Sequence, residues 1–232
     1  SLSTNYNRRN KDVRLYELAT VYMPKALPLT ELPDERQQFI LGMYGNGDFY
    51  TMKGVVEEFF DKIEMKKKPH YNPEAGKPFL HPGRQAEIIY DGTVVGYLGE
   101  IHPDAADNYK LGEKTYVAVV DMPSVLPYAS FDHKYTGIAK YPAVTRDLSL
   151  VVPHAVLAGQ IEEIFDQRGG NILESYQLFD IYEGAQVLAG HKSVAYSITL
   201  RAKDHTLEEK EVTSVMNKIL NGLSNLGIEL RA

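Results

Sequence analysis

Four side chains in the second half of the chain have the types and spacing of a surface that binds unpaired bases. Asp180 and Tyr182 stand two residues apart in a β-rich run, so both point to the same face of the expected strand. Ser149 and Ser193 lie in two other runs in which polar and apolar residues alternate. A tyrosine ring can stack on a base, while a carboxylate and hydroxyl groups can bond to the base edge. In the alternative interpretation, Tyr182 fills a gap and Asp180 caps a turn.

A sheet with one open face must position these side chains. The expected order of elements in this half is strand, helix, strand, strand, helix, strand, which predicts a ferredoxin-like split βαβ unit. Both of its helices cover the same face of the sheet, and the other face stays open. Thr206 and Glu209 predict a capping box at the start of the second helix. The elements are expected at residues 147–152, 157–168, 172–182, 193–203, 206–226 and 228–230.

The first half predicts a second domain of the α+β class, built on antiparallel strands. Asp48 is the expected N-cap of an amphipathic helix that ends near Ile63. Two β-rich runs on either side of Asp91-Gly92 predict a hairpin. Residues 122–140 contain prolines and no regular period, so we interpret them as a linker between domains at 1–138 and 139–232. The other elements are expected at 13–22, 39–44, 103–109 and 116–120.

Composition excludes several kinds of site. The 232 residues are 44% hydrophobic and 24% charged, which is typical of a globular protein. No apolar run approaches the ~20 residues of a membrane-spanning helix, so we expect a soluble, cytoplasmic protein without a membrane partner. The chain has no cysteine, which excludes disulfides, zinc–thiolate sites and cysteine nucleophiles. Its seven histidines form no HExxH motif, and no metal site is predicted.

The charge gives no overall basic surface for nucleic acid. The formal net charge is −6, and from Lys140 onward nine Lys and Arg residues face twelve Asp and Glu residues, a balance of −3. Since phosphate contacts normally supply much of the affinity for nucleic acid, binding would need a local group of cations. The possible phosphate contacts are Lys140, Arg146, Lys192 and Arg201.

No set of catalytic residues is predicted. Residues 42–47 lack the Lys-Ser/Thr pair of a P-loop, and no serine occupies a GxSxG motif. Arg14 and Glu17 are interpreted as a structural salt bridge, and residues 81–84 as a rigid turn before a strand that begins at Ala86.

Several motifs occur in a fixed order. The second half contains Tyr141-Pro142 and the segments 146–152, 179–184, 190–196 and 206–207. This series resembles the ferredoxin-fold anticodon-binding domain that ends the β subunit of bacterial phenylalanyl-tRNA synthetases. Segments 7–17, 48–54, 80–88 and 99–103 resemble the catalytic-like module of the same subunit, which has the class II synthetase fold. The resemblance covers nearly the whole chain but only the C-terminal end of a much longer subunit.

The resemblance implies roles for the four side chains named first. Tyr182 would stack on the first anticodon base of the phenylalanine tRNA, and Asp180 and Ser193 would bond to its edge. Ser149 would lie against the third base. The implied partners are this tRNA and a synthetase α subunit, in a heterotetramer of two α and two β subunits.

The resemblance also implies a division of labour. ATP and Mg²⁺ would serve the whole enzyme, with the aminoacyl-adenylate formed by the α subunit and no cofactor held by this non-catalytic fragment. Two alternatives remain. A small-molecule-binding regulatory module predicts a pocket at a domain edge, because ferredoxin-like folds also bind amino acids. A stand-alone enzyme needs an acid–base or nucleophile set.

Overall fold

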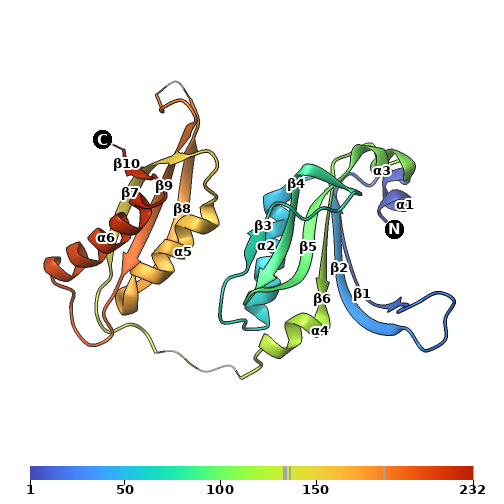
Figure 1. Ribbon diagram of the computed structural model, residues 1–232, viewed down its shortest axis with the longest axis horizontal. Coiled ribbons are helices and arrows are strands. Elements are labelled where there is room, and N and C mark those ends of the chain that lie inside the picture. Colours follow the sequence, from blue (N-terminus) through green and yellow to red (C-terminus); the bar gives the residue numbers. More distant parts are fainter. Residues whose placement is uncertain (133–134, 136, 185, 232) are drawn as a thin grey trace. The chain divides into compact units, whose positions relative to one another are not determined.

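The computed structural model divides into two compact units, Ser1–Lys134 and Tyr135–Ala232 (Figure 1). It describes residues 1–132, 135, 137–184 and 186–231. Both units contain helices and antiparallel strands, which confirms the predicted α+β class. No helix in the described part of the chain is both long and apolar enough to cross a membrane.

The first unit is built on a six-stranded antiparallel sheet with the order β1-β2-β6-β5-β4-β3. Its elements are α1 Leu2–Asn7, β1 Val13–Met23, β2 Asp34–Tyr44, α2 Phe49–Lys62, β3 His70–Asn72, β4 Leu80–Tyr90, β5 Thr93–Ile101, α3 Pro103–Asn108, β6 Thr115–Asp121, α4 Met122–Val125 and the 3₁₀ turn η1 Leu126–Tyr128. The β4–β5 hairpin turns at Asp91 and Gly92, as predicted. Both residues have positive φ, which a two-residue type I′ turn requires.

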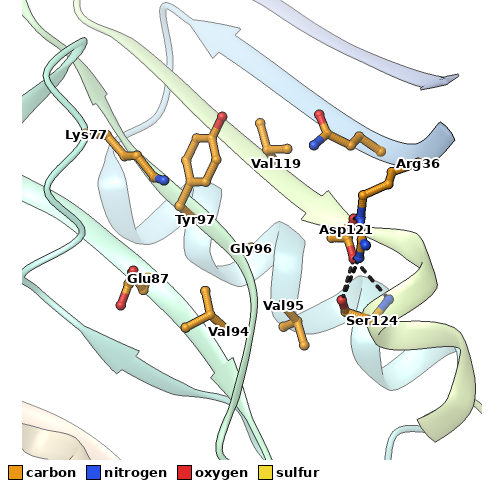
Figure 2. A pocket seen from close by; sticks show the side chains of 11 residues that line it. Arg36, Lys77, Glu87, Val94, Val95, Gly96, Tyr97, Val119, Asp121 and Ser124 are labelled. Atoms are coloured by element: carbon orange, nitrogen blue, oxygen red, sulfur yellow. Dashed lines mark hydrogen bonds and ion pairs between the residues drawn. The ribbon is translucent and has the colours of Figure 1, made fainter. Parts of the chain in front are cut away.

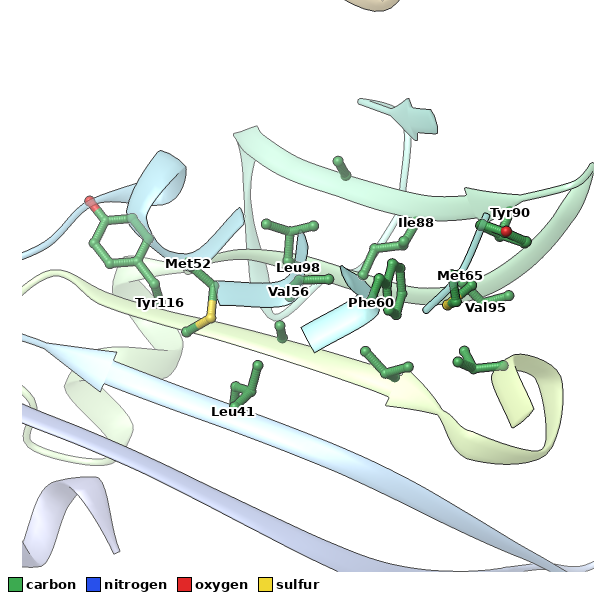
Figure 3. Packing of buried hydrophobic residues seen from close by; sticks show 14 of the residues in the cluster. Leu41, Met52, Val56, Phe60, Met65, Ile88, Tyr90, Val95, Leu98 and Tyr116 are labelled. Atoms are coloured by element: carbon green, nitrogen blue, oxygen red, sulfur yellow. The ribbon is translucent and has the colours of Figure 1, made fainter. Parts of the chain in front are cut away.

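Helix α2 begins at the predicted cap. The Asp48 carboxylate accepts a hydrogen bond from the Thr51 backbone N–H at 2.8 Å, and these N–H bonds hold the pKa of Asp48 below its ordinary value. The buried face of α2 carries Met52, Val56 and Phe60, which pack on one face of the sheet (Figure 3). Each fully buried side chain of this size contributes about 1.5–3 kcal/mol through removal of apolar area from water.

Two sequence predictions for this unit are wrong. Residues 122–128 are not a linker, because they form α4 and η1 and bury Val125 completely in the core of the first unit. Proline is tolerated in the first turn of a helix, so Pro123 did not exclude α4. Strand β4 begins at Leu80, and a register shift between Leu80 and Gln85 accommodates the segment expected to be a turn. Residues 133, 134 and 136 of the predicted linker lie outside the described residues.

The second unit has the predicted βαββαβ order and a four-stranded antiparallel sheet with the order β10-β7-β9-β8. Its elements are β7 Val144–Pro153, α5 Ala158–Arg168, the 3₁₀ turn η2 Gly170–Ile172, β8 Leu173–Tyr182, β9 His191–Leu200, α6 Glu209–Ser224 and β10 Glu229–Leu230.

Both helices of the second unit pack on the same face of its sheet (Figure 1). Phe165 of α5 and Ile219 of α6 are fully buried among Leu150, Tyr196 and their neighbours. The burial of every second residue in β7 and β9 follows the alternation in the sequence. The opposite face of the sheet is therefore left without a helix from this unit.

The predicted N-cap of α6 is wrong. Glu208, and not Thr206, occupies the cap position, and its backbone N–H donates to the Glu211 carboxylate at 2.9 Å. Leu207 is buried in the core, which places the start of the helix two residues later than the Thr206 motif suggests.

Candidate functional site

The open face of the second sheet brings the four predicted side chains together. In the pairing of β8, β9 and β7, Asp180 lies opposite Ala195, which in turn lies opposite Ser149. In the next row, Tyr182 lies opposite Ser193. Side chains directly opposite each other in antiparallel strands have Cβ atoms about 4.5–5.5 Å apart. The four residues thus form one patch, which we call the open-face patch, across the three strands.

A β-bulge in β8 places Asp180 and Tyr182 on the open face. Leu178 pairs with Tyr196 and packs against the core, whereas Asp180 pairs with Ala195, so Phe179 is the extra residue of the bulge. Without this extra residue, strict alternation from Leu178 would turn Asp180 and Tyr182 toward the helices. The bulge therefore determines which face of the sheet carries the patch.

Tyr182 stands at one end of the patch and is 39% exposed. Gly184 lies beneath the end of this ring, since a Cβ atom built on Gly184 would be only 2.4 Å from the Tyr182 hydroxyl oxygen. The ring is held by a glycine contact on one side and remains accessible to solvent. An exposed aromatic ring of this kind can stack on a base.

Arg231 completes the patch and was missed by the sequence analysis. Its backbone N–H donates to the Ser149 carbonyl at 2.9 Å, which continues the pairing of β10 with β7. Its Nη1 donates to the Ser193 hydroxyl at 3.3 Å, and its guanidinium carbon lies 5.9 Å from the centre of the Tyr182 ring. The available signal was the predicted last strand: Arg231 is two residues beyond Glu229 and so falls on the same face.

The four cations proposed as phosphate contacts do not gather at this patch. Arg146 forms an ion pair with Glu209 at 2.8 Å, and Arg201 forms one with Glu174 at 2.9 Å. Lys140 is exposed, and its Nζ lies 5.7 Å from the Tyr141 ring centre. Lys192 is half-buried opposite Val152, on the strand side that faces the core. Two of the four charges are thus already paired inside the unit.

The first unit has a small pocket of about 210 Å³ on the sheet face opposite α2 (Figure 2). Lys77, Tyr97 and Glu87 border one end, and Arg36 and Asp121 border the other. The Lys77 ammonium lies 4.9 Å from the Tyr97 ring centre, and burial raises the pKa of that phenol.

Charge at the other end of the pocket is neutralised by an ion pair. Arg36 Nε donates to the Asp121 carboxylate at 2.8 Å, and this bond raises the pKa of Arg36 and lowers that of Asp121. Asp121 also caps α4 by accepting from the Ser124 backbone N–H at 3.1 Å. None of the described residues that line the pocket is a histidine, the usual base that activates a serine. Arg36, Asp121 and Ser124 are therefore explained by their structural role at the start of α4.

The expected salt bridge between Arg14 and Glu17 is not formed among the described residues. Arg14 donates instead to the Asn46 carbonyl at 3.1 Å. Residues three apart in a strand point to opposite faces, so the two side chains of β1 cannot meet.

Each of the two units matches the model of a known protein family. Residues 1–122 match the family model described as "Phenylalanyl tRNA synthetase beta chain CLM domain". Residues 139–231 match the one described as "Ferredoxin-fold anticodon binding domain". The second match contains the whole open-face patch.

Curated relatives align with the whole chain. Proteins named "Phenylalanine--tRNA ligase beta subunit" from Clostridium acetobutylicum and Clostridium tetani are each 42% identical to it, over 100% of this chain and 29% of their own length. The protein of the same name from Bacillus subtilis is 34% identical, over 97% of this chain and 29% of its own length. The chain thus spans less than a third of the length of these relatives.

Proposed function

The chain belongs to the family of phenylalanyl-tRNA synthetase β chains, and on that premise we propose that its second unit binds the anticodon of a phenylalanine tRNA while the whole ligase charges it. Tyr182 stacks on the first anticodon base. Asp180 and Ser193 bond to the edge of that base, and Ser149 lies against the third base. The family membership agrees with the resemblance drawn from the sequence motifs.

The observation that carries this proposal is the register of the open face. Four residues from three separate motifs meet in two adjacent rows of the sheet, and no helix of the second unit covers them. Tyr182, Asp180 and Ser149 are accessible on this face, and the Ser193 hydroxyl lies on it beneath Arg231. This is the arrangement that single-stranded RNA needs, since an unpaired base offers one face for stacking and an edge for hydrogen bonds.

The first unit supports the assembly and performs no chemical step in this proposal. Among the described residues, no group of three or more His, Asp or Glu side chains is placed to hold a metal ion. ATP and Mg²⁺ act at the partner α subunit, in a cytoplasmic heterotetramer of two α and two β subunits. The name of the relatives, which designates a β subunit, supports a second kind of subunit.

The test is the Tyr182→Ala substitution in the full-length ligase, with Tyr182→Phe and Tyr109→Ala as matched controls. Loss of a stacked ring costs about 1–3 kcal/mol, which is roughly a 5- to 150-fold loss in kcat/KM for the tRNA. Tyr182→Phe keeps the ring and should charge tRNA normally. Tyr109 is an exposed tyrosine of the first unit, so its removal should leave charging unchanged.

Adenylate formation, measured by pyrophosphate exchange without tRNA, should be the same in all these enzymes. Unchanged tRNA charging by Tyr182→Ala would refute the anticodon role of the patch. A loss of adenylate formation in the same variant would refute the assignment of adenylate formation to the α subunit alone. A change in phenylalanine binding alone would favour the regulatory module instead.

A further inference from the structure

The pocket of the first unit has one end whose charges are neutralised and one end whose charges are not (Figure 2). Arg36 and Asp121 neutralise each other at the first end through their ion pair. Lys77 and Glu87 line the other end, and both are half-buried. Within the described part of the chain, no opposite charge comes within the 4.0 Å of an ion pair to either of them. An ammonium and a carboxylate are therefore both available to a molecule that enters the pocket.

The strand register holds the Lys77–Glu87 end together. Glu87 of β4 lies opposite Tyr97 of β5, which in turn lies opposite Val119 of β6. The Cβ atoms of such opposite residues are about 4.5–5.5 Å apart. Lys77 reaches the same ring from the loop before β4. Its ammonium lies 4.9 Å from the Tyr97 ring centre, and its backbone N–H donates to the Gln85 side-chain oxygen at 3.0 Å. The ammonium and the carboxylate thus lie beside one ring without pairing with each other.

These two charges specify a ligand that carries both signs close together. The Lys77 ammonium has three N–H donors, and the Glu87 carboxylate accepts one described hydrogen bond, from the Asn72 side chain at 3.1 Å. An α-amino acid carries a carboxylate and an ammonium on one carbon atom, so it can meet both groups at once. A simple anion or a simple cation would leave one of the two charges without a partner. Hydrogen bonds between charged groups are also stronger than those between neutral groups.

The rest of the pocket limits the size and the side chain of the ligand. Val94, Gly96 and Val119 line it between the two ends and bring no charge. Its volume of about 210 Å³ is below the ~300–1,000 Å³ of a site for a drug-sized molecule, so the ligand is smaller than that. An apolar side chain fits the part lined by valines. A charged side chain would find no partner at the far end, because Arg36 and Asp121 already pair there.

We propose that the pocket of the first unit is a binding site for a small α-amino acid with an apolar side chain. The ligand carboxylate accepts hydrogen bonds from Lys77, its ammonium donates to Glu87, and its side chain lies over Val94 and Val119. No residue of the open-face patch takes part, so the site is independent of the anticodon role of the second unit. It is a ligand site and involves no chemical step.

The test is equilibrium dialysis of the full-length ligase with L-leucine, with L-leucinamide, which lacks the carboxylate, and with 4-methylpentanoate, which lacks the ammonium. The parent enzyme should bind one leucine per β chain and prefer leucine to both analogues. Lys77→Gln and Glu87→Gln should each weaken leucine binding about tenfold, because hydrogen bonds to a charged group are lost. Lys66→Gln is the matched control, since Lys66 is exposed and does not line the pocket.

The analogues assign each charge to its partner. Lys77→Gln should remove the preference for leucine over leucinamide, and Glu87→Gln should remove the preference for leucine over 4-methylpentanoate. Lys77→Arg keeps the charge and should keep the first preference, which separates loss of the contact from loss of the fold. Absence of leucine binding to the parent enzyme would overturn the proposal. So would parent-like binding in Lys77→Gln and Glu87→Gln, an equal loss in Lys66→Gln, or loss of the first preference in Lys77→Arg.

Discussion

The Gly184→Ala substitution tests the position of the Tyr182 ring without changing the ring itself. An added Cβ at Gly184 would lie 2.4 Å from the Tyr182 hydroxyl oxygen and 2.7 Å from the ring carbon that carries it. Ordinary contacts begin at 3.4 Å, so the end of the ring has to move by about 1 Å. Because Tyr182 is 39% exposed, its ring can move outward instead of displacing the backbone.

The displacement should weaken tRNA binding and leave stability intact. The φ angle of Gly184 lies outside the left-handed region, so alanine is compatible with the backbone there. The guanidinium of Arg231 is 5.9 Å from the ring centre, close to the ~6 Å limit of a cation–π contact, and an outward shift of the ring breaks it. We expect a loss of about 3- to 10-fold in tRNA affinity, which is about half of the ~1–3 kcal/mol of a complete stack.

The assay compares the tRNA affinity and the thermal unfolding midpoint of Gly184→Ala with those of Gly159→Ala. Gly159 lies in α5, and nothing stands within 4 Å of a Cβ built on it, so the same change of one methyl group should leave affinity unchanged. Parent-like affinity of Gly184→Ala would show that the ring position is unimportant for binding. A lowered unfolding midpoint would show that Gly184 is needed for folding, and the argument from the ring would then fail.

Two further predictions concern ion pairs remote from the patch. Hydrogen bonds to the carboxylates of Asp204 and, second, Glu211 raise the pKa of His205 in the folded protein. Below the pKa of an unfolded histidine, about 6.5, the charged His205 therefore contributes its full stabilisation to the second unit. This stabilisation is lost as the pH rises through the higher pKa of the folded state. The unfolding midpoint of His205→Gln should therefore lie below the parent's in mildly acid buffer and equal it at alkaline pH, and a constant difference would contradict this. In the first unit, burial raises the pKa of Glu100, but its bond to Arg84 at 2.6 Å outweighs burial and leaves that pKa lowered. Arg84→Met removes the ion-pair partner of this buried carboxylate and leaves it only the weaker effects of Lys114 and Tyr116. The free energy of unfolding, measured with denaturant, should fall by about 3 kcal/mol near pH 7 and by less at pH 4, where burial without Arg84 favours the protonated form of Glu100 in the variant. An equal cost at both pH values would count against a buried charge that has lost its partner.

Much of the second unit follows from short-range patterns in the sequence. Alternation in β7 and β9 specifies which residues are buried, because a strand with one covered face has a period of two. The same alternation does not predict which face of the sheet carries Asp180 and Tyr182. It depends on one extra residue at Phe179, and a bulge is a property of the pairing with β9 and not of the strand's own sequence. The i, i+2 spacing could show that the two residues share a face, while only the register shows which face it is.

Contacts between distant segments account for what the sequence did not predict. Arg231 belongs to the patch because β10 pairs with β7, which brings residues 231 and 149 together. Val125 belongs to the first core because Asp121 caps α4 and Arg36 fixes Asp121 from β2. The spacing of residues within one segment carries no information about such partners. The ion pairs of Arg146 with Glu209 and of Arg201 with Glu174 also join separate elements, so the spacing within one segment does not show them either.

The energetics of the patch favour discrimination between bases over retention of the tRNA. A single stack contributes about 1–3 kcal/mol, which is less than the 4.1 kcal/mol that corresponds to a dissociation constant of about 1 mM. The unit also carries a net charge of −3 from Lys140 onward, which is unfavourable for binding a polyanion. Stacking on Tyr182 accepts any base, so in the proposed function the preference between tRNAs comes from the edge bonds to Asp180 and Ser193. A hydrogen bond to a charged group contributes about 1.5–3 kcal/mol, roughly a 10- to 150-fold preference. In the proposed function, other parts of the ligase therefore supply most of the affinity for tRNA, and the open-face patch selects which tRNA is bound.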